Sequence, residues 1–132
     1  PHSKGMLGHS DGDALLHAVC DAILGAVGAG EIGIYFPPTD LTIMGISSRV
    51  IAEKTLEILH SKKGELQQID AVLVGESPKL MTHYAAIRKS LAEVFGLDEE
   101  NVNVKAKSHE GMGELGKGEA MSCQAMVLVS LK

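Results

Sequence analysis

The chain has 132 residues and a formal net charge of −5, with 45% hydrophobic and 22% charged residues. This composition indicates one globular domain with one core, and the acidic balance argues against nucleic acid or an anionic membrane as a partner. No apolar run approaches the roughly 20 residues of a membrane span, and we expect neither a secretory signal nor a transit segment. Cys20 and Cys123 are too few for a disulfide framework, which favours a reducing compartment.

Hydrophobic periodicity and turn residues predict three helices and three strands, in the order helix, helix, strand, helix, strand, strand. The first helix is expected to start at cap candidates within residues 10–13, after a short lead-in, and to end near Gly28. Ser47 or Ser48 caps the second helix, which closes at residues 62–64. The later predicted elements are a buried strand over 69–74, a helix over 82–95 with Gly96 as its C′ residue, a half-exposed strand over 102–107 and a final strand over 121–131.

This element order predicts an α+β fold of two layers, with a mixed sheet and helices packed on one face. Residues at helical spacing define the predicted inner faces, which are Val50, Ile51, Thr55, Ile58 and Leu59 in the second helix and Tyr84, Ile87, Leu91 and Val94 in the third. The other face of the sheet would be apolar and uncovered. Such a face predicts burial against copies of the chain.

Asp13, His17 and Asp21 form a carboxylate–imidazole–carboxylate stripe on the first predicted helix. Their i, i+4, i+8 spacing places them on one helix face, while the apolar residues around them predict burial on most sides. Charged groups in such a setting need partners, and the start of a helix is a natural phosphate site. Spacing alone leaves two interpretations open: a functional site, or a capping Asp13 with a satisfied core His17.

Residues 111–118 nearly match the phosphate-binding P-loop, with two glycines and Lys117 at the right spacing. Gly118 replaces the hydroxyl residue that would hold Mg²⁺, and Glu114 lies inside the would-be anion cradle. The residues that follow predict a strand rather than the helix that a P-loop requires. A P-loop NTPase, which predicts ATP hydrolysis abolished by changing Lys117, is therefore the least favoured interpretation.

Five segments resemble the 2-C-methyl-D-erythritol 2,4-cyclodiphosphate synthase family in order and spacing. They are His9-Ser-Asp-Gly-Asp-Ala-Leu-Leu-His17, Glu31-Ile-Gly-Ile-Tyr-Phe-Pro, Gly75-Glu-Ser-Pro-Lys-Leu-Met, Asn103-Val-Lys-Ala and the loop from Glu110 to Glu119. The resemblance implies that 4-diphosphocytidyl-2-C-methyl-D-erythritol 2-phosphate is closed to the 2,4-cyclodiphosphate with release of CMP, a phosphorus–oxygen lyase reaction of non-mevalonate isoprenoid synthesis. It also implies a homotrimer whose sheets face its centre and whose sites lie at the subunit interfaces.

The resemblance further implies two metal ions and no covalent nucleophile. His17 would be a zinc ligand, because zinc accepts a neutral imidazole nitrogen, and Glu110 would hold Mg²⁺ or Mn²⁺ between the diphosphate phosphates. His9 and Ser108 would be the catalytic residues that stabilise the transition state. Since the substrate's own phosphate attacks, catalysis would be positioning plus electrostatics. Asp21 is interpreted as support for the short polar turn that leads into the first helix, rather than as a ligand.

The substrate-binding residues implied by the resemblance fall into three sets. The methylerythritol phosphate would meet His9, Ser10 and Asp13, with a loop from Phe36 to Asp40 closing over it. The cytidine would meet Glu31 and Gly33 at the ribose and Gly75, Pro78, Lys79, Leu80 and Met81 at the base, with Lys79 beside the phosphates. The diphosphate would meet Ala106, Lys107, Ser108 and Glu110, partly from a neighbouring subunit, and Lys117 is also counted as substrate-binding.

One part of the family pattern falls before this chain begins. The family's zinc site also uses an Asp-x-His pair on an N-terminal strand, so residues 1–132 are expected to form a single synthase domain that lacks this segment. We therefore expect the chain as written to bind zinc poorly and the full-length protein to restore binding. Glu114 and Lys117 stand where an aromatic residue and Arg often face the trimer channel, so we do not expect the isoprenoid diphosphate that some members hold there.

A second function class is left open, which is a non-catalytic trimeric nucleotide-binding module with an incomplete metal site. Binding of CMP without turnover would distinguish this module from the synthase. The expected compartment is the bacterial cytoplasm, or else the plastid stroma or apicoplast.

Overall fold

The computed structural model describes the backbone of residues 2–36, 48–74, 84–107 and 122–132, and the side chains from residue 13 onward within these ranges. Its elements are α1 (His2–Ala26), α2 (Ile32–Tyr35), α3 (Ser48–Ser61), β1 (Gly64–Val74), α4 (Tyr84–Phe95), the 3₁₀ turn η3 (Glu99–Asn101), β2 (Val102–Lys107) and β3 (Ser122–Leu131). The three long helices and three strands confirm the predicted order. The short α2 and η3 are additions that the sequence did not predict.

The sheet is mixed, as predicted, with the strand order β2-β1-β3. The central strand β1 runs parallel to β2 and antiparallel to β3. Val74, at the end of β1, pairs with Lys107 at the end of β2 and with Ser122 at the start of β3. The segments 75–83 and 108–121 are therefore joined to the same end of the sheet.

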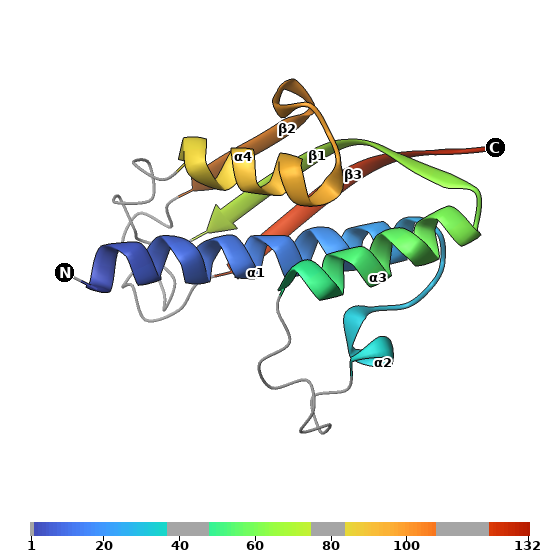
Figure 1. Ribbon diagram of the computed structural model, residues 1–132, viewed down its shortest axis with the longest axis horizontal. Helices are drawn as coiled ribbons and strands as arrows, with labels where there is room; N and C mark the ends of the chain where they lie inside the picture. Colours follow the sequence, from blue (N-terminus) through green and yellow to red (C-terminus); the bar gives the residue numbers. More distant parts are fainter. Residues whose placement is uncertain (1, 37–47, 75–83, 108–121) are drawn as a thin grey trace.

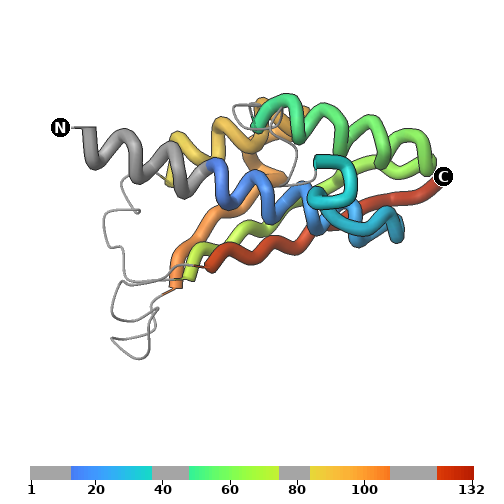
Figure 2. The backbone as a smooth tube through the Cα atoms, turned by 90° about the horizontal axis from the view of Figure 1, so that it is seen from below, coloured from blue at the N-terminus to red at the C-terminus, as the bar shows by residue number. Residues whose placement is uncertain are grey.

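Helices α1, α3 and α4 form a second layer on one face of the sheet (Figures 1 and 2). Helix α1 packs across β3 and β1, while α4 covers β2. The largest fully buried side chains come from both layers and include Leu15, Ile23, Leu24, Leu59, Ile69, Leu91 and Val102. Burial of these apolar side chains is the main stabilising term, and the two-layer α+β prediction is confirmed. Among the described residues, no helix has the length and apolarity to span a membrane.

Helix α1 starts earlier than the sequence predicted. The cap candidates in residues 10–13 lie inside the helix, which extends back to His2. Once a helix is nucleated, each added residue gains one hydrogen bond, so the packed part of α1 can propagate backward through weak helix formers. Proline is tolerated only in the first turn of a helix, and Pro1 stands directly before His2. The prediction that the helix starts within residues 10–13, after a short lead-in, is therefore wrong.

The C-terminus of α1 agrees closely with the predicted glycine ending. Gly28 has a φ of 69°. Its amide donates to the carbonyl of Gly25 at 3.1 Å, and the amide of Ala29 donates to the carbonyl of Leu24 at 2.8 Å. These two bonds satisfy helix-end carbonyls in a Schellman motif. Gly96, with the same φ of 69°, ends α4 as predicted.

The inner face of α3 differs from the prediction at Val50, Ala52 and Ile58, the last of which is only half-buried. Ile51, Thr55 and Leu59 are buried as expected, but Ala52 joins them and Val50 is 46% exposed. Successive residues on an α-helix are about 100° apart, so a face centred on positions 51, 52, 55 and 59 turns Val50 away from the core. In α4 the predicted Ile87 and Leu91 are buried, together with Ala92 and Phe95.

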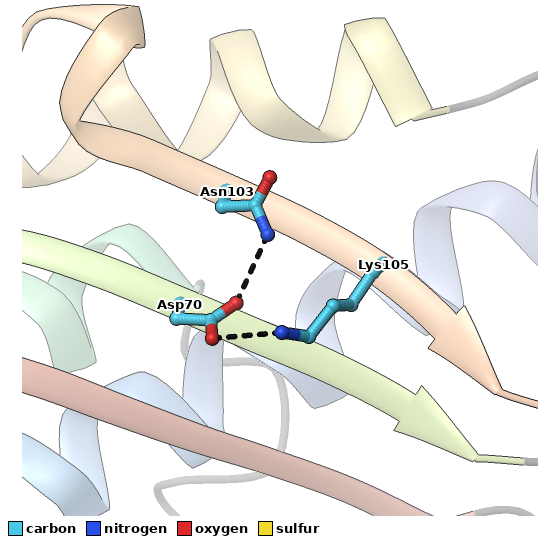
Figure 3. A network of polar contacts seen from close by, with 3 residues as sticks. All are labelled: Asp70, Asn103 and Lys105. Carbon is cyan, nitrogen blue, oxygen red and sulfur yellow. Dashed lines mark hydrogen bonds and ion pairs between the residues drawn. The ribbon is translucent and has the colours of Figure 1, made fainter.

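The sheet face that the helices leave open is mixed, so the prediction of an apolar face is wrong. Met126 is 75% exposed and Leu128 is 59% exposed. Beside them, Asp70 accepts hydrogen bonds from Asn103 at 3.1 Å and from Lys105 at 3.0 Å (Figure 3). The ammonium of Lys105 and the amide of Asn103 hold the pKa of Asp70 below its usual value. Strand alternation places these polar side chains opposite the buried ones.

Candidate functional site

The predicted stripe lies on the exposed side of α1. His17 and Asp21 are exposed and Asp13 is half-buried. The buried face of the helix is formed by Leu15, Leu16, Val19, Cys20, Ile23 and Leu24. The prediction that α1 is buried on most sides is therefore wrong, and so is the interpretation of His17 as a core histidine. Polar groups on this face can meet a ligand without the cost of burying an unpaired charge.

His17 is tied to the start of α3. Its Nε2 shares a hydrogen bond with the Ser48 hydroxyl at 3.3 Å, across 31 positions of the sequence. Ser48 is the first residue of α3. The contact restricts the imidazole ring and leaves Nδ1 as the second ring nitrogen that could bind another group.

Asp21 is tied to the start of α2. Its Oδ1 accepts the backbone N–H of Ile32 at 2.8 Å. Ile32 is the first residue of α2, and the preceding Glu31 is its N-cap but makes no side-chain cap hydrogen bond. The interpretation of Asp21 as support for a turn agrees with this contact, although the turn it supports is the one that carries Glu31 and Gly33.

The end of α2 forms one wall of an open groove against the outer face of α3. The groove has a volume of about 320 Å³ and is lined by Tyr35, Phe36, Val50, Glu53, Lys54 and Glu57. The Tyr35 hydroxyl donates to the carbonyl of Ala29 at 2.7 Å, which fixes the ring that lines the groove. Phe36 also packs against the core, so the first residue of the predicted Phe36–Asp40 loop is anchored.

Ala106 and Lys107 lie at the carboxyl end of β2. They pair with Leu73 and Val74, the last two residues of β1. Lys107 is exposed and Ala106 is half-buried. The end of the sheet that was expected to hold the diphosphate therefore presents one cation to solvent within the described residues.

Several predicted residues lie outside the described residues. These are Asp40, Gly75, Pro78, Lys79, Leu80, Met81, Ser108, Glu110, Glu114 and Lys117. His9 and Ser10 belong to the backbone of α1, but their side chains are not described. The roles expected for these residues stay predictions.

The described site residues fall into two groups. One group is formed by His17, Asp21 and α2, beside the C-terminal half of α1. The other is formed by Ala106 and Lys107 at the strand ends, which lie toward the N-terminal half of α1 in both views (Figures 1 and 2). A single copy of the chain thus presents the predicted ribose turn and the predicted diphosphate floor on separate parts of its surface.

The described residues do not complete a zinc site. No group of three or more His, Cys, Asp or Glu side chains among them could hold a metal ion, whereas catalytic zinc is held by three protein ligands. His17 offers one suitable imidazole. Cys20 lies on the buried face of α1, away from the exposed His17, and burial raises the pKa of its thiol to about 11, as is typical of a cysteine in core packing. Neither Cys20 nor Cys123 forms a disulfide bond.

Sequence reasoning missed two contributors to this site. Ser48 was expected only as a helix cap, and its contact with His17 joins residues 31 positions apart. The backbone amide of Ile32 carries no side-chain signal. The i+8 spacing of Asp21 from Asp13 was the sole available hint to the second contact.

Known proteins match almost all of the chain. Residues 1–130 match the model of the YgbB family. The 2-C-methyl-D-erythritol 2,4-cyclodiphosphate synthase of Gloeobacter violaceus is 46% identical over 98% of this chain and 79% of its own length. That of Syntrophotalea carbinolica is 44% identical, with the same coverage of 98% and 79%.

Solved structures agree with these sequence matches. The bifunctional IspDF of Campylobacter jejuni superposes with a TM-score of 0.84 at 32% identity, covering 90% of this chain and 32% of that chain. The Plasmodium falciparum IspF–CDP complex superposes with a TM-score of 0.78 at 28% identity, covering 90% of this chain and 71% of that chain. On the family match and these relatives, the chain belongs to the YgbB family, alongside the 2-C-methyl-D-erythritol 2,4-cyclodiphosphate synthases.

Proposed function

We propose that the protein closes 4-diphosphocytidyl-2-C-methyl-D-erythritol 2-phosphate to 2-C-methyl-D-erythritol 2,4-cyclodiphosphate and releases CMP. The observation that carries this proposal is 46% identity over 98% of the chain to a protein named as this synthase. The exposure of His17 and Asp21 supports it, since the predicted stripe is accessible to a ligand. The reaction makes the protein a CMP-releasing phosphorus–oxygen lyase.

In the proposed reaction an oxygen of the substrate's 2-phosphate attacks the β-phosphorus of the diphosphate. The bond from the β-phosphorus to the bridging oxygen breaks, and CMP leaves with that oxygen. His9 and Ser108 would donate hydrogen bonds to the phosphate oxygens as charge shifts between them. Ser10 and Asp13 would hold the methylerythritol phosphate, so that the attacking oxygen lies in line with the leaving group.

Residues of α2 and residues at the strand ends would hold different parts of the substrate. Glu31 and Gly33 would meet the ribose, and the segment Gly75–Met81 would form the base pocket with Lys79 beside the phosphates. Lys107, exposed at the end of β2, would place a cation on the diphosphate floor next to Ala106. Phe36 and Asp40 would border the methylerythritol, with Lys117 as a further anion contact.

The two groups of site residues lie on separate parts of one copy, which favours a site shared between copies. We therefore propose a homotrimer in which the α1–α2 group of one subunit faces the strand-end group of its neighbour. The open sheet face supports this assembly, because Met126 and Leu128 are 75% and 59% exposed there and large exposed apolar side chains favour association. A heterologous interface of this kind closes into a ring.

The metal ions of the resemblance are part of the proposal. His17 would hold zinc together with ligands that lie outside the described residues, and Glu110 would hold Mg²⁺ or Mn²⁺. When bound, these ions would draw negative charge from the phosphates. The contact with Ser48 restricts the ring of His17, and an oriented ring is typical of metal-binding histidines.

Phosphorus NMR of the protein with the diphosphocytidyl substrate, Zn²⁺ and Mg²⁺ tests the proposal. The expected result is loss of the substrate signals and growth of the signals of CMP and of a cyclic diphosphate. A matched variant, His17→Ala, should lose most of the turnover and its bound zinc while keeping its oligomeric state. Binding of CMP by the parent protein without any cyclic product would instead support the non-catalytic module.

A further inference from the structure

The turn between α1 and α2 is held by contacts on both of its sides. On one side the Asp21 carboxylate accepts the amide of Ile32 at 2.8 Å. On the other side the Tyr35 hydroxyl donates to the carbonyl of Ala29 at 2.7 Å. Gly30 has a φ of 91°, which favours glycine, and a Cβ at this position would collide with the side chain of Ile34. A four-residue helix gains little stability from its own hydrogen bonds, so these contacts determine where α2 lies.

The contact made by Asp21 is the one that acts on the proposed ligand residues. Ile32 lies between Glu31 and Gly33, so its amide fixes the backbone of both neighbours relative to α1. Glu31 is the N-cap of α2 but makes no side-chain cap hydrogen bond. Asp21 thus does for the first turn of α2 what a capping side chain does in most helices.

We infer that Asp21 is a positioning residue, which holds the Glu31–Gly33 turn where it can receive the ribose of the nucleotide. This inference rests on the proposed function, since the ribose contact is part of it. Asp21 lies one helical turn from His17 on the same face of α1. The Asp21 carboxylate therefore holds the Glu31–Gly33 turn in a fixed position relative to His17, the proposed zinc ligand.

Asp21→Ala tests the inference, with Asp21→Asn as the conservative variant and Asp98→Ala as the matched control. Asparagine keeps an oxygen at the accepting position, whereas alanine removes it. Asp98 is likewise an exposed carboxylate, and it is the N-cap of η3 but makes no side-chain cap hydrogen bond. Each variant is assayed by titration with CMP, by titration with the cyclic diphosphate, which lacks a ribose, and by hydrogen exchange of residues 29–36.

Asp21→Ala is expected to bind CMP about tenfold more weakly, the effect of losing one charge-assisted hydrogen bond. It should exchange faster across residues 29–36 and bind the cyclic diphosphate like the parent. Asp21→Asn should recover most of the CMP affinity, and Asp98→Ala should match the parent throughout.

Three results would overturn the inference. Unchanged CMP affinity in Asp21→Ala would show that the turn needs no support, and equal loss of both ligands would show a general structural role. Failure of Asp21→Asn to recover affinity would exclude the hydrogen bond as the cause. If the parent protein itself binds no CMP, the proposed function fails as well, so the two failures are distinguishable.

Discussion

Replacing Gly30 with alanine tests how the α1–α2 turn is built. Gly30 has a φ of 91°, a conformation that L-residues rarely adopt, and an added Cβ would collide with Ile34. Gly28 offers a matched control, because its φ is 69° but nothing lies within 4 Å of an added Cβ. Both variants therefore strain the backbone, and Gly30→Ala alone also pushes on α2.

The expected losses of stability and of CMP affinity follow from the backbone strain and from the collision with Ile34. A left-handed conformation costs a non-glycine residue roughly 1–2 kcal/mol, so each variant should lower the unfolding midpoint by about 3–8 °C. Ile34 is 61% exposed and can move aside, so the collision should add little to the loss of stability. Moving Ile34 shifts α2, however, and with it the Glu31–Gly33 turn.

Thermal unfolding and CMP titration of the two variants separate the backbone strain from the displacement of α2. We expect similar losses of stability, but a CMP affinity that is about five- to tenfold lower in Gly30→Ala than in Gly28→Ala. Equal CMP affinities in the two variants would refute the argument that Ile34 and Gly30 together place α2. A Gly30→Ala variant as stable as the parent would refute the assigned backbone strain.

Three further predictions concern the core, the open sheet face and the buried thiol. Leu59→Ala should lower the free energy of unfolding by about 2–5 kcal/mol, because Leu59 is fully buried. The exposed control Val50→Ala should change it by less than about 0.5 kcal/mol. Equal losses in denaturant unfolding would contradict the described inner face of α3. Asp70→Asn should cost at most about 1 kcal/mol at pH 7, because the ion pair lies at the surface and is partly exposed. Folding lowers the pKa of Asp70. Its contribution to stability is therefore present above the pKa of the unfolded chain and is lost as the pH falls through the pKa of the folded protein. A difference in stability between parent and variant that persists at about pH 2 would contradict this pH dependence. Cys20 should resist iodoacetamide at pH 8 until the protein unfolds, because burial raises its pKa to about 11, and mass spectrometry of labelled native protein would reveal any modification there.

Features that depend on local pattern could be predicted from the sequence. The three long helices, three strands and the glycine ends at Gly28 and Gly96 follow from periodicity and from the conformational freedom of glycine. The alternation of Val102 and Val104 with polar neighbours identified β2. These elements settle the α+β class because few two-layer arrangements accommodate such an order.

Features that depend on contacts between distant residues could not be predicted in the same way. Helix α2 has four residues and is held by Asp21, which lies 11 positions before Ile32. The start of α1 was missed because helix propagation outweighed the local signals of the cap candidates. The polar network on the open sheet face pairs Asp70 with residues 33 and 35 positions away.

The arrangement of the predicted stripe follows only in part from local pattern, for the same reason. The stripe of Asp13, His17 and Asp21 does share one face of α1, since that follows from helical geometry. The exposure of the stripe was not predicted, because the apolar residues between its positions suggested burial, whereas they fill the opposite face of α1. Ser48 contacts His17 only because α3 packs against α1, and no local sequence pattern predicts that contact.

The central claim is that a site shared between neighbouring copies closes the ring. His17→Ala and Ser108→Ala would each inactivate one of the two groups, so trimers of either variant alone should be inactive. Mixed trimers made by unfolding and refolding an equal mixture should regain about one quarter of the sites, because a site is intact only when its His17 comes from the Ser108→Ala variant and its Ser108 comes from the His17→Ala variant. Phosphorus NMR of the mixture should then show cyclic diphosphate and CMP at about one quarter of the parent rate. Absence of cyclic product from the mixture, with an active parent, would contradict the shared site, and absence from the parent would contradict the function itself.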